Sequence, residues 1–267
     1  MKAVIAFLSL LSISVTAFAA DVGLMSFNVR VPVDAAPNDW ASRAPRVARI
    51  LKTYSPDVVG LQESDQGHIQ SIEALTDYRL ASGINTGIIY RPQSLSILEQ
   101  GEFYYTETPD DPKNQTPVWG QKYFHRCVWV LFQVKTSGEK FYVLNNHLSY
   151  VSSAWKPMVQ LLTQRSIEKS KSGIPVFVMG DMNIPESNEW ISYMKNQGLR
   201  DTYREMKPNI QDDGTFHDWT GRTSDEKIDY IFGVGLFKTI EAKIIHDLVD
   251  GQFATDHFPI FSKVQVE

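Results

Sequence analysis

The sequence predicts an α/β protein in which two mixed β-sheets pack together and helices cover their outer surfaces. Two observations carry this prediction. A strand, helix, strand order occurs twice, ending once at Glu63 and once at Asp181. Several other strand-like runs are separated only by short turns, which indicates antiparallel hairpins. The sheets should therefore contain antiparallel pairs besides the parallel pairs that the two strand, helix, strand units form. This combination is typical of a layered α/β sandwich.

The first half of the chain alternates strand-like and helix-like segments. In chain order we expect a strand ending at Asn28, a helix over 42–54, a strand over 57–63, a helix over 67–75, and strands over 86–90 and 95–105. The helices are predicted because apolar residues recur three or four positions apart. Pro56 then ends the first helix, since the residue before a proline disfavours helical geometry.

The second half continues the alternation. We expect a polar loop over 106–122, strands over 124–134 and 140–147, a helix from about 152, a strand over 174–181, a helix over 189–196, a strand over 227–232 and a last strand after His257. Ser152 or Ser153 is expected to cap the longer helix and Ser187 the shorter one, which Gly198 stops. The loop over 106–122 exceeds most connections and is a candidate functional segment.

Length and composition indicate one large domain. The chain has 267 residues, 43% of them hydrophobic, and no composition shift or repeat marks an internal boundary. The single cysteine, Cys127, excludes an internal disulfide and lies in an apolar run, where we interpret it as a core residue rather than a catalytic thiolate. We expect residues 21–267 to form one catalytic domain that acts as a monomer.

Residues 1–20 differ from the rest of the chain. Lys2, the apolar stretch 3–11 and the small-residue triplet 17–19 are typical of a secretory signal peptide. The alternative is an uncleaved membrane anchor, but this apolar stretch is shorter than the roughly 20 residues that a span needs. No later apolar segment of the sequence is long enough to span a bilayer. We expect a secreted or periplasmic protein.

Without residues 1–20 the chain keeps 25 basic and 31 acidic residues, a formal charge of −6. A protein that binds long polyanions normally carries a basic face, so extended nucleic-acid binding is possible but not favoured. A local basic patch remains open.

Four predicted strands end abruptly in polar residues. They end at Asn28, at Glu63, at His147 and at Asp181, which Asn183 follows two positions later. Residues two apart on an extended chain point to the same side, so Asp181 and Asn183 can address one target. The recurrence predicts one convergent polar site.

These residue types suit phosphoester hydrolysis. A lone carboxylate such as Glu63 among amides and waters suits Mg²⁺, whereas zinc is disfavoured by the lack of histidine and cysteine ligand spacing. Asp181 with Asn183 can orient a water and hold a phosphate oxygen. Asp256 and His257 place an imidazole beside a carboxylate. Hydrolysis of a phosphate ester needs these parts, namely a positioned nucleophile, a cation and donors to the phosphoryl oxygens.

Each residue also has a structural interpretation. Asn28 and Asn183 could form turns, His147 could be a core histidine, Asp229 could pair with Lys227 or Arg222, Asp256 could cap a turn, and His257 could be exposed. Their joint occurrence favours a site. A Ser-His-Asp hydrolase is disfavoured because no G-x-S-x-G motif is present. A non-catalytic binding module is the other alternative, against which the intact Glu63, Asp181 and His257 argue.

The ordered motifs S-F-N, L-Q-E, N-N-H-L, G-D-M-N, K-I-D-Y-I-F and T-D-H-F-P-I resemble the endonuclease/exonuclease/phosphatase superfamily, which includes deoxyribonuclease I. The resemblance covers essentially the whole chain after the signal peptide. It implies a four-layered α/β sandwich and a hydrolase that cleaves phosphoester bonds with Mg²⁺ or Mn²⁺.

The resemblance also implies roles for the polar residues. Asn28, Glu63 and Asp256 would lie at the metal, Asp181 would orient the attacking water, Asn183 and His147 would bind phosphate, His257 would stabilise or protonate at the scissile phosphate, and Asp229 would complete the cation or histidine network. Arg126 is a candidate phosphate contact or a salt-bridging strand-edge residue. His217 is a candidate for the same cleft.

The subgroup stays open. Inositol phosphate 5-phosphatases carry P-A-W-x-D-R where this chain has D-E-K-I-D-Y, and abasic-site endonucleases are usually intracellular, which a signal peptide contradicts. The N-D-W loop and the Y-Y-T-E-T-P-D stretch resemble secreted bacterial members. His68, His125 and His246 belong to no motif and are expected in surface or packing roles.

The predicted substrate is a phosphomonoester or phosphodiester, with DNA or RNA as the alternative. The negative charge disfavours long polynucleotides. Trp119, Tyr123 and Phe124 could stack on a base, a sugar or another flat headgroup, or could simply pack. We therefore expect a small or terminal phosphoester rather than internal sites of duplex DNA.

Overall fold

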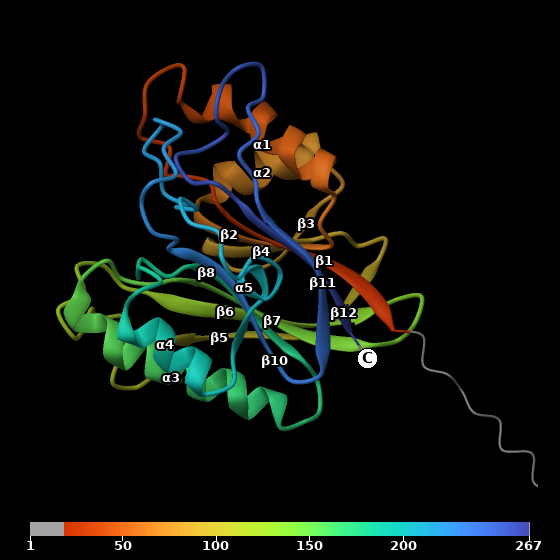
Figure 1. The fold of residues 1–267 in the computed structure, drawn as a ribbon, viewed down its shortest axis with the longest axis vertical. Helices are drawn as coiled ribbons and strands as arrows, with labels where there is room; N and C mark the ends of the chain where they lie inside the picture. The colour runs from red at the N-terminus through yellow and green to blue at the C-terminus, as the bar shows by residue number, and fades with distance from the viewer. Residues whose placement is uncertain (1–18, 267) are drawn as a thin grey trace, which may run out of the picture.

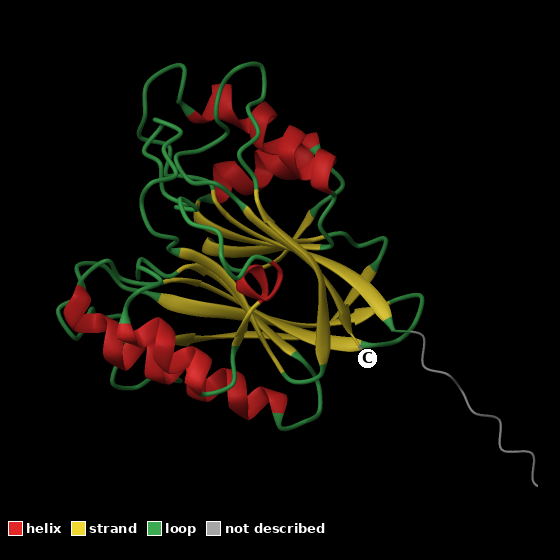
Figure 2. Ribbon diagram, viewed as in Figure 1, coloured by secondary structure: helices red, strands yellow, loops and turns green. Residues whose placement is uncertain are grey.

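The computed structural model of the protein describes residues 19–266 (Figure 1). In this part of the chain two six-stranded sheets lie face to face, with α1 and α2 on one outer side and α3 and α4 on the other (Figure 2). The four layers confirm the predicted α/β sandwich. Residues 1–18, which hold nearly all of the expected signal peptide, lie outside the described residues. No helix within 19–266 is long and apolar enough to cross a membrane.

The first sheet has the strand order β11-β12-β1-β2-β4-β3. Its strands are β1 (Ala20–Asn28), β2 (Val58–Ser64), β3 (Arg79–Ser82), β4 (Asn85–Tyr90), β11 (Phe237–Ile244) and β12 (Ile260–Val266). β1 and β2 are parallel and α1 (Trp40–Tyr54) connects them, while α2 (Gln66–Leu75) packs beside α1. The other neighbouring strands are antiparallel.

The second sheet has the strand order β5-β6-β7-β8-β10-β9. Its strands are β5 (Leu95–Tyr104), β6 (Arg126–Val134), β7 (Lys140–His147), β8 (Val176–Asp181), β9 (Arg200–Asp201) and β10 (Asp229–Val234). β7 and β8 are parallel, connected by α3 (Ser152–Ser170), and the other neighbours are antiparallel. α4 (Glu189–Asn196) packs against α3, and α5 (Thr202–Met206) contacts β10 and β11.

Apolar side chains fill the spaces between all four layers. On β1, Val22 and Leu24 belong to the core between the sheets, whereas Met25 and Phe27 belong to the core under α1 and α2. Successive side chains of a strand point to opposite faces, so a strand with helices on one side and a sheet on the other is apolar at nearly every position. This burial on both faces explains the continuous apolar runs of the sequence.

A polar contact crosses the apolar space between the sheets. Asn145 on β7 accepts a 2.7 Å hydrogen bond from the Gln62 amide on β2 and donates to two backbone carbonyls of the first sheet at 2.8 Å. Both side chains are buried. Because buried polar groups are costly unless paired, this contact favours one alignment of the two sheets. Gln62 precedes Glu63 and Asn145 lies two residues before His147, so it aligns two strands that end in polar site residues.

Several local features differ from the sequence prediction. β3, β9, α5 and β11 were not predicted. The first three have two to five residues, which carry too little periodicity, and in β11 an irregularity between Thr239 and Glu241 interrupts the strand alternation. The predicted serine caps are wrong. Val151 precedes α3 without a side-chain cap, and Asn188, not Ser187, caps α4 by accepting from the Trp190 amide. Cys127 is buried, as predicted.

Candidate functional site

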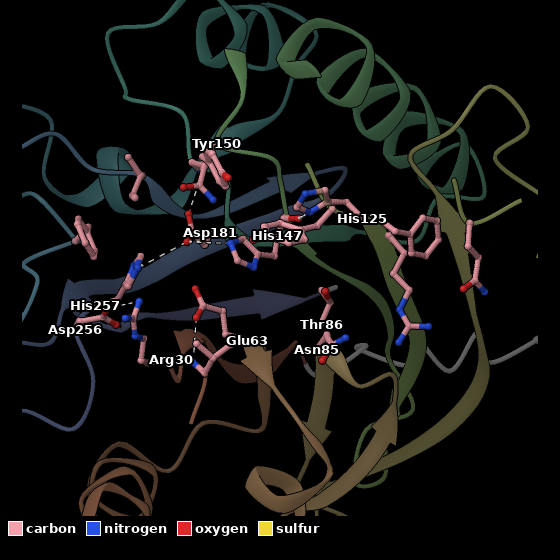
Figure 3. A pocket seen from close by; sticks show the side chains of 18 residues that line it. Arg30, Glu63, Asn85, Thr86, His125, His147, Tyr150, Asp181, Asp256 and His257 are labelled. Atoms are coloured by element: carbon pink, nitrogen blue, oxygen red, sulfur yellow. Dashed lines mark hydrogen bonds and ion pairs between the residues drawn. The ribbon is translucent and has the colours of Figure 1, made fainter. Parts of the chain in front are cut away.

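A cavity of about 790 Å³ lies where β1, β2, β7 and β8 end (Figure 3). β1 is parallel to β2 and β7 is parallel to β8, so the C-terminal ends of each pair lie together. Seven residues singled out in the sequence line the cavity, namely Glu63, Arg126, His147, Asp181, Asn183, Asp256 and His257. Asn28 and Asp229 do not line it, but they are hydrogen-bonded to residues that do.

Four lining residues, namely Arg30, Glu63, Asn85 and Asn183, adopt a backbone conformation that is rare for residues other than glycine. Glu63 has φ 59° and Asn183 has φ 51°. Glu63 also lies at an irregularity in the pairing of β2 with β4. Such backbone positions cost of order 1–3 kcal/mol and cluster at functional sites, and a bulge re-aims a side chain out of the regular alternation. Strained backbone positions therefore recur around the cavity, at or next to the ends of β1, β2, β4 and β8.

The Asn28 side chain links the two sheets at the cavity. Its amide nitrogen lies 3.1 Å from a Glu63 carboxylate oxygen on the first sheet and 3.1 Å from Asp181 Oδ2 on the second. Its oxygen accepts a 2.9 Å bond from the Arg30 amide, and the other Glu63 oxygen accepts from the Val31 amide at 3.0 Å. Asn28 therefore fixes the carboxylates of Glu63 and Asp181 relative to one another.

Two fully buried side chains hold the loop after β1 from behind. Arg43 of α1 donates to the carbonyl groups of Val29 at 2.5 Å and Arg30 at 3.1 Å, and His68 Nε2 of α2 lies 3.0 Å from the same Arg30 carbonyl. Burial lowers the pKa of Arg43 to about 10, so the guanidinium stays charged at neutral pH. This loop supplies the Val31 amide that bonds Glu63, so the two helices position the carboxylate indirectly.

On the second sheet, Asp181 lies between two histidines. Its Oδ2 atom is 3.5 Å from His147 Nε2 and 3.8 Å from His257 Nε2. Burial, reinforced by the neighbouring charge of Asp229, raises the pKa of Asp181 to about 6. His257 Nδ1 lies 2.9 Å from Asp229 Oδ2. Burial acts to lower the pKa of His257, but Asp229 and then Asp181 raise it to about 10, which makes His257 an imidazolium at neutral pH.

Asp256 completes the first-sheet side of the cavity. Its Oδ2 atom lies 3.4 Å from Arg30 Nη1, and Thr255 Oγ1 lies 3.2 Å from its Oδ1. Burial raises the pKa of Asp256. Burial also acts to raise the pKa of Glu63, but His147 and the hydrogen bonds from Val31 and Asn28 bring that pKa below its ordinary value.

Two groups of side chains could hold a metal ion. Asp181, Asp229 and His257 offer ligand atoms within 4.8 Å of one another, but His257 Nδ1 is already bonded to Asp229. Glu63 and Asp256 offer carboxylate oxygens to the same cavity from the other sheet. Oxygen-only donors with room for water suit Mg²⁺ or Mn²⁺. The Glu63 and Asp256 side therefore fits such a cation better.

The two candidate substrate contacts are placed differently. Arg126 lines the cavity, but one guanidinium nitrogen lies 2.9 Å from Glu102 and the other donates to the Ile84 carbonyl at 2.6 Å, so it also forms the salt bridge considered from the sequence. The His217 ring does not line the cavity and stacks on Phe258 with 4.1 Å between ring centroids. Burial lowers the pKa of His217 to about 4. This placement supports a packing role for His217.

Sequence reasoning missed several residues of the site. Arg30 and Tyr150 line the cavity, and so does His125, which was expected in a surface or packing role. The β6–β7 hairpin could have revealed the position of His125 from the sequence. In an antiparallel hairpin, residues at equal distances from the turn face one another, so Cys127 pairs with Asn146, and His125 lies beside the end of β7. Its Nδ1 lies 2.8 Å from the carbonyl of His147.

Comparisons with known proteins agree with this architecture. Residues 25–257 match the family model described as endonuclease/exonuclease/phosphatase family. A solved protein of that description from Bacteroides thetaiotaomicron superposes with a TM-score of 0.83 at 22% identity, covering 94% of this chain and 99% of that one. No curated protein matched the sequence.

Two further solved structures have the same fold. A mannosyl-6-phosphatase from Bacteroides thetaiotaomicron gives a TM-score of 0.80 at 22% identity, covering 91% of this chain and 99% of its own. The TDP2 protein of D. rerio, complexed with a single-strand DNA product, gives 0.75 at 20% identity, covering 92% and 99%. At these identities the likeness establishes the fold.

Proposed function

Because the chain belongs to the endonuclease/exonuclease/phosphatase family, we propose that it hydrolyses phosphoester bonds with the help of Mg²⁺ or Mn²⁺. The observation that carries the proposal is the Asn28 amide, which donates to Glu63 of the first sheet and to Asp181 of the second. It holds the carboxylates of Glu63 and Asp181 at one cavity, which supports proposing one as a metal ligand and the other as an acid–base group. The same family includes phosphatases and nucleases, which share this reaction on different substrates.

On the first-sheet side, Glu63 and Asp256 would hold the cation. Once bound, the cation offsets the negative charge that develops on the phosphoryl oxygens. The Asn28 oxygen already accepts from the Arg30 amide, so Asn28 would act mainly by orienting the Glu63 carboxylate. Oriented neighbours of this kind tune and fix metal ligands.

On the second-sheet side, Asp181 would accept the proton of the attacking water. The pKa of Asp181, raised by burial to about 6, suits a base at neutral pH. The water oxygen bonds to phosphorus as the bond to the alcohol oxygen breaks, and that oxygen keeps the electron pair and takes up a proton. The Asn183 amide holds the other Asp181 oxygen at 2.9 Å, which keeps the carboxylate oriented.

The two histidines would bind the phosphoryl group. Asp229 keeps His257 protonated, so its imidazolium can pair with a phosphoryl oxygen or give a proton to the departing alcohol oxygen. His147 lies on the other side of Asp181 and can donate to a second oxygen.

We further propose that the enzyme works outside the cytoplasm, in the periplasm or as a secreted protein. The support is the signal-peptide pattern in residues 1–20. N-terminal sequencing of exported protein would test this, with Ala20 or Asp21 expected as the first residue. Recovery of the intact N-terminus only from the cytoplasm would contradict it.

The function is tested by a substrate screen. Purified protein lacking residues 1–20 is incubated with Mg²⁺ or Mn²⁺ and with sugar phosphates, nucleotides, phospholipid headgroups, DNA and RNA. We expect hydrolysis of at least one small phosphoester, with no activity on carboxylic esters. Absence of any phosphoester cleavage would instead favour the alternative of a non-catalytic binding module.

A nuclease activity is the second candidate function. The observation that favours it is the pair of exposed tyrosines lining the cavity, Tyr123 and Tyr150, on which bases could stack. The TDP2 structure with bound DNA product belongs to the same fold. We expect small phosphoesters to be preferred, because the net charge is negative. Plasmid nicking that falls steeply between about 50 and 200 mM salt would reverse this preference.

A further inference from the structure

The cavity extends past the residues that act on the phosphoryl group. Figure 3 places Asn85, Thr86 and His125 beyond His147, on the side away from His257. Phe124 also lines the cavity. We call this set, Asn85, Thr86, Phe124 and His125, the far wall. The proposed hydrolysis uses none of it.

The far wall contains a buried polar atom that lacks a partner in the described chain, beside the hydroxyl of a nearly buried threonine. Thr86 lines the cavity and is only 5% exposed. His125 Nδ1 faces the His147 carbonyl at 2.8 Å and must donate to it, which leaves Nε2 as an acceptor. Nε2 is buried and has no partner among the described residues. Such atoms cost free energy unless a water or a ligand pairs with them.

The far wall also carries little net charge. Burial lowers the pKa of His125 to about 4, so its ring is neutral at neutral pH. The adjoining guanidinium of Arg126 is paired with Glu102 at 2.9 Å and bonded to the Ile84 carbonyl. A second phosphate would therefore find no unpaired cation among these groups. The wall suits an uncharged group that forms hydrogen bonds.

Aromatic rings also line the cavity. Tyr123 is 58% exposed and Tyr150 is 53% exposed, and both line the cavity. The Phe124 ring is supported from behind by Tyr104, with 5.4 Å between ring centroids. Exposed aromatic rings at a polar cavity are typical of sites that stack on a ring of the ligand.

We propose that the far wall binds the alcohol half of the substrate and that this half is a sugar. The proposal rests on the phosphoester hydrolysis proposed above. Sugar hydroxyls both donate and accept, so one can donate to His125 Nε2 while another accepts from the Thr86 hydroxyl, and the sugar ring can lie against Phe124 of the same wall. The cavity volume of about 790 Å³ lies within the roughly 300–1,000 Å³ usual for small-molecule sites, so a sugar phosphate has room.

The test compares two leaving groups in matched variants. Thr86→Val keeps the side-chain shape and removes the hydroxyl, and Thr86→Ser restores it. For each variant, kcat/KM is measured with glucose 6-phosphate and with p-nitrophenyl phosphate, whose leaving group carries no additional hydroxyl. Thr86→Val is expected to lower the sugar-to-nitrophenyl ratio by about 10-fold, the effect of one hydrogen bond, and Thr86→Ser should recover most of it. Thr136→Val, in the exposed β6–β7 turn, is the control and should leave the ratio unchanged.

Each outcome decides one point. An unchanged ratio in Thr86→Val would overturn the sugar assignment while nitrophenyl turnover upheld the proposed hydrolysis. If no phosphoester is turned over, the proposed hydrolysis fails. In that case, calorimetry compares the affinity of the protein for glucose 6-phosphate with its affinity for inorganic phosphate. This comparison tests sugar binding by the far wall independently of turnover. Tighter sugar phosphate binding that Thr86→Val abolishes would support it, and equal binding of both ligands would overturn it.

Discussion

The two halves of the sandwich share one pairing pattern but hold their buried cations differently. In each sheet the central pair of neighbouring strands is parallel and the two pairs on either side of it are antiparallel, read from β11 to β3 in the first sheet and from β5 to β9 in the second. In the first half the buried Arg43 donates to backbone carbonyls of the loop after β1. In the second half the buried Lys227 lies 2.8 Å from the Asp201 carboxylate and 3.9 Å from Glu186.

The difference follows from what each half contributes to the cavity. Carbonyl groups satisfy the hydrogen bonds of Arg43 without cancelling its charge, which then remains to favour the nearby Asp256 carboxylate. The charge of Lys227 is neutralised by the neighbouring carboxylates of Asp201 and Glu186, so it contributes little electrostatic potential at the cavity. Under the proposed function, the same connectivity would thus give one half that holds the cation and one half that transfers protons.

Removal of the cation is expected to cause the largest loss of turnover. It also tests whether the metal site belongs to the first half of the sandwich. In excess chelator, turnover should fall to background and return with Mg²⁺ or Mn²⁺, because the developing phosphoryl charge is no longer offset. Calorimetry should also show that Glu63→Gln loses most Mn²⁺ affinity while Asp181→Asn keeps it. Full activity in chelator would remove the proposed metal role of the first half.

Loss of the acid–base groups should come next. Asp181→Asn and His257→Ala are each expected to lower kcat by roughly 10²-fold or more, as removal of a positioned acid–base group does. Circular dichroism should show unchanged folding, and Asp77→Asn on the surface serves as the matched control. Near-wild-type turnover in either variant would show that its assigned role is wrong.

The order of the elements and the class of chemistry followed from local pattern, whereas the support of the site did not. Apolar runs ending in polar residues marked Glu63 and Asp181 because both strands are buried on two faces. Arg43 could not be recognised from its position in the sequence. An arginine on an amphipathic helix is usually exposed, and its burial depends on where a loop 12 to 14 residues away folds back. The pairing of His257 with Asp229 likewise depends on the packing of two sheets.

The buried cations provide a third prediction. Arg43→Met should destabilise the protein by roughly 3 kcal/mol, because several carbonyls lose a charged donor, and should also weaken Mn²⁺ binding by about 10-fold. Lys227→Met should destabilise by a similar amount, since it leaves the buried Asp201 carboxylate without its cation, yet leave Mn²⁺ affinity intact. Urea unfolding and calorimetry measure the two quantities. Equal losses of Mn²⁺ affinity in both variants would remove the distinction between the halves.

The smallest expected effect is a difference in acid sensitivity. Burial acts to raise the pKa of Glu186, but Arg204, Lys227 and Lys195 lower it to about 2. A carboxyl whose pKa is depressed in the folded state contributes stability above its ordinary pKa and loses it as the pH falls towards the folded value. Stability of the second half should therefore decline between about pH 4.5 and 2.

Glu186→Gln isolates that contribution. The variant should be less stable than wild type at pH 6, and the gap should narrow as the pH approaches 2. The carbonyl partners of Arg43 do not titrate, so hydrogen exchange at the loop after β1 should show no matching change from this source. A gap of constant size across the range would exclude the Glu186 pairing as its cause.

The first and last strands of the described chain are neighbours in the first sheet, where Ala20 pairs with Val266 and β12 lies between β11 and β1. During synthesis the ribosome delivers β1 before the other described strands and β12 after them, so this sheet cannot close until residues 260–266 have been made. Asp256 and His257 are delivered just before that strand. A nascent chain that stops short of β12 therefore lacks a finished sandwich, and one that stops before residue 256 also lacks two of the proposed site residues.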